Sequence, residues 1–332
     1  MLRYFGGILL GFLIAAGIWT ALVLDSLGIP GSHGDRVLST WYRVKVDAAR
    51  AIKRPKIVLL GGSNVLYGLR ASEIERRLGI PCVNFGTHAG LPCAYLFERA
   101  RMILRRGDIL VLSMEWGYLS APLDMVTPVF SGRVLSGDAP YFWRMNPAAQ
   151  ALMVFSAPPG RLLLPFAVGR SESAAIQDAY RDALLAHDLD AQGDLIANRP
   201  DQRAKPVLEE LAGGHSGWWE TRGASEDAPY WQAVREMVVW TRKRGIRMFY
   251  AAPALLRRAA EGAPEAQRYF SDAERHYEAL GVDVLTRQAD NFYPPELMFD
   301  SLYHLNAEGA ARRTEALIQA LEPAAKAHFL KN

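Results

Sequence analysis

Two patterns of hydrophobic and polar positions alternate along much of the chain. Short apolar runs, of the length that forms buried parallel strands, occupy residues 56–60, 82–85, 109–112, 246–252 and 282–285. Segments with the 3.6-residue period of helices lie between and after these runs, at residues 67–79, 93–106, 229–244, 266–279 and 307–321. Strands that alternate with helices favour a parallel sheet with right-handed crossovers. The pattern therefore predicts an α/β domain.

The N-terminal stretch has a different pattern, because residues 4–24 are apolar without a single charge. About 20 apolar residues span a bilayer as a helix. Arg3 precedes the stretch, and Asp25 and Asp35 follow it, which favours a cytoplasmic N-terminus. We therefore expect residues 1–27 to be a transmembrane anchor in the inner membrane, with the remaining chain in the periplasm. A cleaved signal peptide is the rival interpretation.

Beyond the anchor, residues 28–54 are expected to be a tether that contains a basic, solvated helix. Residues 55–330 are expected to form the α/β domain. Its regular pattern is interrupted at about 118–228 by a stretch rich in Pro and Gly, with helical pieces near 172–187 and 205–212. We interpret this stretch as a long insertion in the domain.

Composition narrows the function classes. Half of the 332 residues are hydrophobic, which excludes a disordered or low-complexity chain. The net charge is only +3, whereas nucleic-acid binders usually carry a stronger, clustered basic excess, so no nucleic-acid partner is expected. Cys82 and Cys93 either pair or remain two buried thiols. The chain has no compact metal signature, so neither a metal nor a cofactor is expected.

The segment GGSNVLYG places Ser63 directly after the first strand and before a helix. The two preceding glycines allow a tight turn that exposes the hydroxyl at the carboxyl edge of the sheet, where doubly wound sheets bind ligands. The Ser63 backbone N–H lies near a helix N-terminus and can donate to an oxyanion. A helix N-cap is the structural alternative for this serine.

A second polar segment, FDSLYHLNAEG, precedes the last helix and contains Asp300 and His304. A nucleophilic serine needs a base, and the base needs a carboxylate that orients it. Asp290 and Glu296 are alternative orienting acids. Asn306 is predicted to be the N-cap of the final helix.

The order Ser63, Asp300, His304 resembles the SGNH/GDSL hydrolase superfamily, whose members have a flavodoxin-like three-layer α/β/α fold with a parallel sheet. The resemblance implies that Ser63 is the nucleophile, His304 the base and Asp300 its orienting acid. The chain departs from the family pattern at Gly62, which stands where the G-D-S motif has Asp. The last block is also one residue longer than the usual D-x-x-H.

The same resemblance implies an oxyanion hole completed by a glycine after strand two and an Asn after strand three. The loop VNFGTHAGLP offers Gly90 first and Gly86 second. The segment LSMEWGYL after strand three has no Asn, so the third donor is either absent or supplied by Asn64, a backbone N–H near Trp116 or His88. Loss of one donor typically costs about 10²–10³ in rate.

Several further side chains have both a functional and a structural interpretation. Glu115 at the end of strand three either binds a sugar hydroxyl or forms an ion pair with Arg70. The aromatic pairs at 218–219 and 230–231 either stack on sugar rings or fill a core. The arginines at 312–313 are expected to be surface charges.

The C-terminal segment and the anchor together resemble membrane-anchored proteins of exopolysaccharide O-acetylation, as for alginate and cellulose, and the D-alanyl transfer protein of teichoic acid synthesis. This resemblance implies that a membrane-bound O-acyltransferase partner supplies an acyl group, most often acetyl. Ser63 would carry the group as an acyl-enzyme and pass it to a secreted polysaccharide. A carbohydrate O-acetyl esterase, and a non-catalytic glycan-binding or assembly subunit, are the alternatives.

Overall fold

The structure, a computed structural model, describes residues 2–123, 125–162, 188–202, 227–258 and 263–330. The chain divides into two compact units, residues 1–41 with 126–182 and residues 42–125 with 183–332. This division differs from the expected one, because residues 126–162 group with the N-terminal helix and not with the sheet. The helical pieces expected near 172–187 and 205–212 lie outside the described residues.

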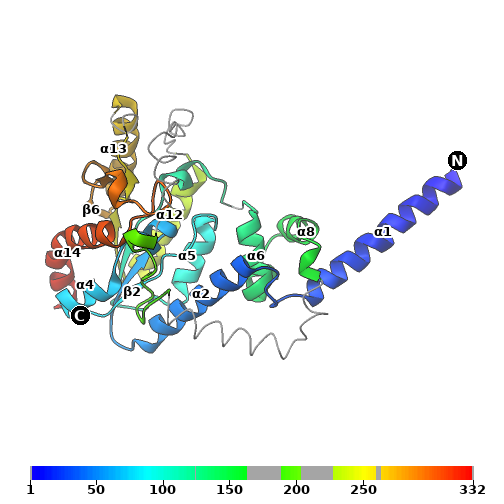
Figure 1. The fold of residues 1–332 in the computed structure, drawn as a ribbon, viewed down its shortest axis with the longest axis horizontal. Helices are drawn as coiled ribbons and strands as arrows, with labels where there is room; N and C mark the ends of the chain where they lie inside the picture. Colours follow the sequence, from blue (N-terminus) through cyan, green and yellow to red (C-terminus); the bar gives the residue numbers. More distant parts are fainter. Residues whose placement is uncertain (1, 124, 163–187, 203–226, 259–262, 331–332) are drawn as a thin grey trace. The chain divides into compact units, whose positions relative to one another are not determined.

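The second unit is built on a five-stranded parallel sheet with the order β2-β1-β3-β4-β6 (Figure 1). Counted along the chain this is the order 2-1-3-4-5 of flavodoxin-like folds, so the predicted fold class is confirmed. The first three strands are buried throughout, as expected for strands covered on both faces. The strands are β1 (Ile57–Leu60), β2 (Cys82–Asn84), β3 (Ile109–Leu112), β4 (Arg247–Ala251) and β6 (Asp283–Thr286).

Helices cover both faces of this sheet and make the three layers. Helices α4 (Ala71–Leu78) and α14 (Ala307–Phe329) pack together on the face to which Ile57 and Leu59 point. Since side chains alternate along a strand, Val58 and Leu60 point to the other face. That face is covered by α5 (Cys93–Arg101) and α12 (Pro229–Lys243), while α13 (Pro264–Ala279) packs beside β6.

Element boundaries follow local backbone geometry. The helix predicted at 67–79 is two helices, α3 (Ser63–Gly68) and α4, and Gly79 ends α4 with a φ of 68°, a left-handed conformation that suits glycine. The last helix continues to Phe329. The remaining short elements of this unit are η1 (Trp116–Ser120), β5 (Leu255–Leu256), η4 (Gln288–Asp290), β7 (Phe292–Tyr293), η5 (Pro295–Leu297) and η2 (Pro200–Gln202).

The expected tether is a helix, α2 (His33–Ala51), and its second half is not solvated. Tyr42 and Lys45 are buried in the sheet unit. The Lys45 ammonium donates to the Asn84 carbonyl at 2.8 Å and also to the Gly193 carbonyl. Burial lowers the pKa of Lys45 to about 7. This half of α2 is therefore part of the core of the unit that contains the sheet.

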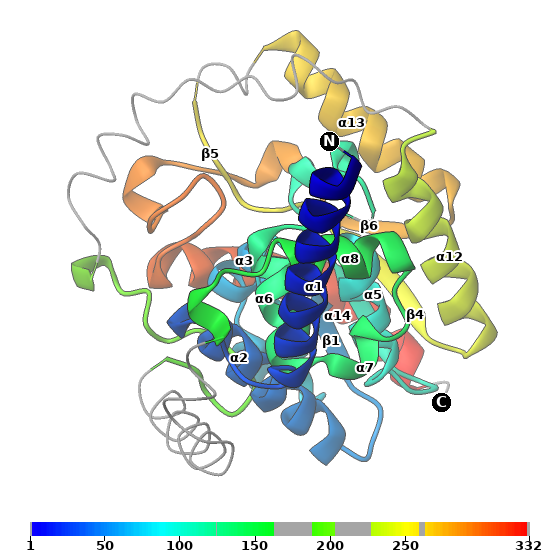
Figure 2. The same ribbon diagram turned by 90° about the vertical axis from the view of Figure 1, so that its right-hand side faces the viewer.

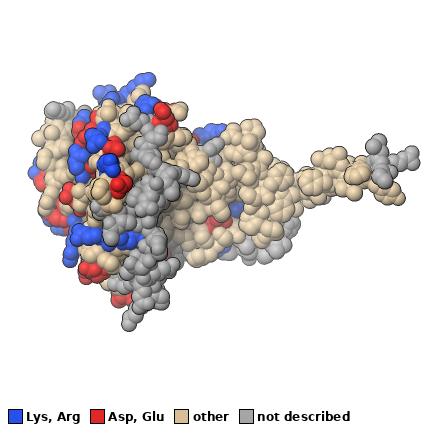
Figure 3. Space-filling model, turned by 90° about the horizontal axis from the view of Figure 1, so that it is seen from above, with Lys and Arg blue, Asp and Glu red and all other residues tan. Residues whose placement is uncertain are grey.

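The first unit contains α1 (Leu2–Asp25), the first part of α2, α6 (Pro128–Gly137), α7 (Ala139–Phe142) and α8 (Pro147–Phe155). Helix α1 is long and apolar enough to cross a membrane, a property that a signal sequence shares. Residues 4–24 of α1 include no Lys, Arg, Asp or Glu, and Figure 3 shows this helix tan, without blue or red atoms, along its described length. Helix α8 packs against α1, as Figures 1 and 2 both show.

A buried arginine joins α14 to the carboxyl edge of the sheet. The Arg313 guanidinium donates to the carbonyl of Asn64 at 2.9 Å, to the Asn64 side-chain oxygen at 3.1 Å and to the Ser113 hydroxyl at 2.8 Å. It also donates to the Ala252 carbonyl at 2.9 Å. The expectation of two surface arginines is thus correct for Arg312 and wrong for Arg313, whose pKa burial lowers to about 10.

We expect Arg313→Leu to lower the free energy of unfolding by about 3 kcal/mol or more. Hydrogen bonds to a charged group contribute about 1.5–3 kcal/mol each, and the buried acceptors would lose their donor. Urea unfolding of the detergent-solubilised chain, followed by tryptophan fluorescence, measures the change. The neighbouring Arg312→Leu is the matched control and should stay within about 0.5 kcal/mol of the parent. Equal stability of the two variants would contradict the structural role of Arg313.

Candidate active site

Ser63 begins α3 directly after the carboxyl end of β1, where the predicted turn is tightly enclosed. A Cβ on Gly61 would lie 2.0 Å from the Ser113 carbonyl oxygen. A Cβ on Gly62 would lie 2.5 and 2.6 Å from the two carboxylate oxygens of Glu115. At Gly61 the backbone itself leaves no room for a side chain, whereas at Gly62 a side chain would require the Glu115 carboxylate to move. Ser63 itself keeps 9% of its surface exposed.

Glu115, which follows β3, accepts hydrogen bonds from the backbone of this turn. Its carboxylate accepts hydrogen bonds from the Gly62 N–H at 3.2 Å and the Asn64 N–H at 2.9 Å. The Ser63 hydroxyl donates to the same carboxylate at 3.4 Å. The expected ion pair with Arg70 is wrong, because Arg70 donates to the Leu195 carbonyl and the Asn198 side chain. Glu115 thus places a carboxylate where a side chain at position 62 would lie.

Asp300 and His304 lie in a short loop between η5 and α14 that an antiparallel bridge closes. The Phe299 N–H donates to the His304 carbonyl at 2.7 Å, and the Asp300 carboxylate lies 2.5 Å from His304 Nδ1. The acid on His304 is therefore Asp300 and neither Asp290 nor Glu296. As predicted, Asn306 caps α14 by accepting the Gly309 N–H at 3.0 Å.

Tyr67 connects this loop to the Ser63 helix. Its ring stacks on the His304 ring with centroids 4.0 Å apart and planes 3° apart. Tyr67 follows Ser63 by four residues, so both side chains lie on one face of α3, one turn apart. Burial first, and the Asp300 charge second, raise the pKa of Tyr67 to about 12, so its hydroxyl stays neutral. Sequence reasoning missed Tyr67, although the i,i+4 spacing from Ser63 was a usable signal.

The stacking places the His304 ring against the side chain of Tyr67, which lies one helical turn from Ser63. Among the described residues His304 Nε2 has no hydrogen-bond partner, and the hydroxyl of Ser63 donates to Glu115 and not to His304. Asp300 and His304 are thus connected through Tyr67 to the helix that Ser63 begins.

Three of the expected oxyanion donors are already engaged. The Gly90 N–H donates to His88 Nδ1 at 2.9 Å, and the Gly86 N–H donates to the Asn84 side chain at 3.0 Å. The Asn64 side-chain amide donates to the Ser113 carbonyl at 3.0 Å and is fully buried. Each of these three groups thus has a hydrogen-bond partner within the chain.

The His88 ring still has one N–H group that can donate a hydrogen bond. Because its Nδ1 accepts the Gly90 N–H, the neutral ring carries its proton on Nε2. The His88 side chain is exposed at the surface, and its partial desolvation first, and electrostatic repulsion from His304 second, lower its pKa, whereas Glu115 acts in the opposite direction. This mutual influence places His88, His304 and Glu115 in one electrostatic environment. The Ser63 N–H and His88 Nε2–H are donors without a protein partner within the described part of the chain.

The structure also decides between the alternatives that the sequence left open for one aromatic pair and for the two cysteines. Tyr230 and Trp231 are buried in the core, so sugar stacking is wrong for this pair. Residues 218–219 lie outside the described residues. Cys82 and Cys93 are two free, buried thiols, the second of the two expected arrangements. No group of three or more metal-ligating side chains occurs in the ranges that the structure describes.

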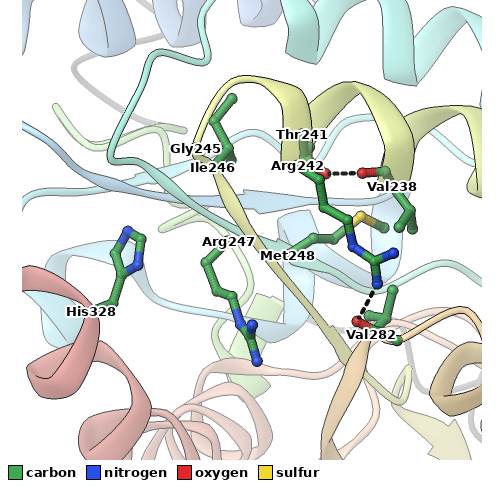
Figure 4. Close-up of a pocket in the computed structure, with 10 residues that line it drawn as sticks. Val238, Thr241, Arg242, Gly245, Ile246, Arg247, Met248, Val282 and His328 are labelled. Atoms are coloured by element: carbon green, nitrogen blue, oxygen red, sulfur yellow. Dashed lines mark hydrogen bonds between the residues drawn. The ribbon is translucent and has the colours of Figure 1, made fainter.

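A cavity of about 330 Å³ lies at the opposite, amino-terminal end of β4 (Figure 4). Its cationic side chains are engaged, since Arg242 donates to the carbonyls of Leu280 and Gly281 and Arg247 pairs with Asp283. Because Ser63 lies at the carboxyl edge of the same sheet, this cavity is separate from the site around Ser63.

Comparison with family models gives no match, and neither does comparison with curated proteins. One matching solved structure is that of a protein proposed to be lipolytic and assigned to the G-D-S-L family, from Desulfitobacterium hafniense DCB-2. The two chains are 12% identical, and the match covers 81% of this chain and 100% of that chain with a TM-score of 0.38. Similarity at this level supports no assignment of function.

His88 should make the stability of the chain depend on pH. Its pKa lies below the ordinary 6.5 in the folded chain, so the unfolded chain binds the proton first as the pH falls through about 6.5. Stability is therefore present above that pH and is lost below it. His88→Asn keeps a side-chain acceptor for the Gly90 N–H but does not titrate. Between about pH 7.5 and 5.5 the melting temperature should fall more for the parent than for this variant; parallel curves would contradict the inference.

Proposed function

We propose that this protein is a serine-dependent acyl-transfer enzyme in which Ser63 is the nucleophile, His304 the general base and acid, and Asp300 its orienting carboxylate. The observation that carries the proposal is the Asp300–His304 pair, stacked on Tyr67 one turn from Ser63. Nδ1 of His304 is held by Asp300, so Nε2 is the nitrogen available for proton transfer. The order of these residues resembles the SGNH/GDSL superfamily.

The reaction would proceed through an acyl-enzyme. The Ser63 oxygen bonds to the carbonyl carbon of an acyl ester while His304 Nε2 takes the hydroxyl proton. The C–O bond to the leaving alcohol then breaks, and His304 returns the proton to that oxygen. In the second half an acceptor hydroxyl gives its proton to His304 and attacks the acyl carbon. Collapse of this intermediate frees the acylated acceptor and reprotonates Ser63.

Two donors support the negative charge that develops on the carbonyl oxygen. The Ser63 N–H lies at the start of α3. The Nε2–H belongs to the neutral ring of His88, in the loop after β2. Donors that are fixed before the reaction are usually the largest contribution to such catalysis. In this proposal His88 takes the place of the Asn that the family carries after strand three.

The substrate class follows from the resemblance of the C-terminal segment and the anchor. We infer O-acyl transfer, most often of acetyl, to a secreted polysaccharide on the periplasmic side of the inner membrane. A membrane-bound O-acyltransferase would supply the acyl group. If water is the acceptor, the same site is a carbohydrate O-acetyl esterase, and exclusion of water decides between the two.

One observation favours a non-catalytic function. The Ser63 hydroxyl donates to Glu115, and the N–H groups of Gly86 and Gly90 are engaged. A subunit that uses this fold to bind a glycan or to assemble an envelope complex needs no activated serine.

Labelling of the full chain in detergent with a serine-reactive fluorophosphonate distinguishes these functions. We expect an adduct on the Ser63 peptide by mass spectrometry, because an activated serine attacks phosphorus as it attacks a carbonyl. His304→Ala should abolish the adduct. Ser301→Ala, a serine of the His304 loop, is the matched control and should be labelled like the parent. A folded parent chain without an adduct would favour the non-catalytic subunit.

Tyr67 should act as a positioning residue. Tyr67→Phe keeps the ring on His304, so the rate of fluorophosphonate labelling should remain within about twofold of the parent. Tyr67→Leu removes the ring, and the rate should fall at least about tenfold, since a base that is misplaced by about 1 Å loses much of its effect. Equal rates for the two variants at equal melting temperature would argue against positioning by stacking.

A further inference from the structure

Helix α8 presents an apolar face to its surroundings. Leu152 and Phe155 are 55% and 58% exposed, and Trp143 just before the helix is 59% exposed. Residues 145–160 contain no charged side chain. A surface helix in water normally carries polar residues on its outer face. The exposed residues of α8 form one helical stripe, Pro147, Ala148, Ala151, Leu152 and Phe155.

The position of α8 along α1 determines how deep the stripe would lie in a membrane that α1 spans. The Trp19 indole N–H donates to the Val154 carbonyl at 2.8 Å. Trp19 precedes Asp25, the end of the candidate span, by six residues, which is about 9 Å of helix rise. The headgroup layer occupies roughly 5–8 Å on each side of the hydrocarbon core. When α1 spans a bilayer, α8 therefore lies at the border between headgroups and acyl chains.

The connection between α1 and the rest of the first unit fixes this depth. The buried Arg161 guanidinium donates to the carbonyls of Ser26, Ile29 and Leu135 at 3.1, 2.7 and 2.8 Å. Val23, in the last turns of α1, is fully buried. The end of the apolar helix is thus part of a folded unit, and α8 cannot slide along α1 without breaking these bonds.

We propose that α8 is an interfacial membrane helix whose exposed stripe inserts among the lipids of the leaflet from which α1 emerges. The stripe has no charged or hydrogen-bonding side chain for recognition of a protein, and it belongs to a helix that packs against α1, whose own apolar side chains are exposed. The helix satisfies its own backbone groups, as a lipid environment requires. Trp143 stands beside the stripe, and tryptophan is enriched at membrane interfaces. The proposal rests on α1 as a membrane span and is independent of the catalytic assignment.

Depth-dependent fluorescence quenching tests this insertion. The full chain carries one environment-sensitive nitrobenzoxadiazole label on Ala151→Cys and is reconstituted alone in phosphatidylcholine vesicles. A fraction of the lipid bears a nitroxide, near the top of the acyl chain in one set of vesicles for residue 151 and near the end of the chain in a second set for residue 15. Ala15→Cys in α1 is the control for insertion of the anchor, and Ala311→Cys on the exposed side of α14 is the control for water. The unsubstituted chain, with Cys82 and Cys93 buried, gives the background.

We expect the label at 151 to be quenched by the nitroxide lipid, with blue-shifted emission, and the label at 311 to be unaffected. Because the vesicles contain no other protein, a protein partner cannot produce this result. Quenching at 15 without quenching at 151 would overturn the proposal and would indicate that a protein covers the stripe. Absence of quenching at 15 would show that α1 does not insert and would also overturn the proposal. Neither result would bear on Ser63.

Discussion

The candidate site depends on how the backbone of the Ser63 turn is satisfied. The first N–H groups of a helix have no partner within the helix, and this turn is too buried for water to serve all of them. The carboxylate of Glu115 accepts two of these N–H groups, and the guanidinium of Arg313 donates to the Asn64 carbonyl on the other side. Two buried charged side chains from distant segments therefore fix the position of a short helix and of its serine.

This arrangement connects two departures from the G-D-S pattern that look unrelated in the sequence. Gly62 lacks the usual carboxylate, and the segment after strand three carries Glu115 in place of an Asn-containing block. In the structure the Glu115 carboxylate fills the space beside Gly62. The Glu115 carboxylate thus lies where a side chain at position 62 would lie.

The sequence pattern of neighbouring residues was enough to predict individual strands, the Ser63 turn and the Asp300–His304 loop. The apolar run at 109–112 coincides with β3, and the position of Ser63 between β1 and a helix follows from the two glycines. The spacing of Asp300 and His304 places both in one loop. Arg313 shares the buried stripe of Ala310 and Leu317, a helical phase from which its burial was predictable.

Features that depend on the register between distant segments were not predictable in this way. Glu115 meets the Ser63 turn across 51 residues of chain because β1 and β3 are neighbours in register. The association of residues 126–162 with the N-terminal helix leaves no periodic signal, since α8 is apolar on both of its faces. The buried half of α2 carries a lysine and a polar pattern, which in the sequence is typical of a solvated helix.

That buried lysine has a consequence for the thermodynamics of the whole unit. Lys45 has a pKa of about 7 in the folded chain and 10.5 as its ordinary value. Between these pH values the folded chain holds fewer protons than the unfolded chain, so folding releases a proton and is favoured by rising pH. Below pH 7 both states carry the proton, and the folded state must accommodate a buried cation among carbonyl oxygens. The contribution of Lys45 to the stability of the sheet unit therefore rises with pH between about 7 and 10.5.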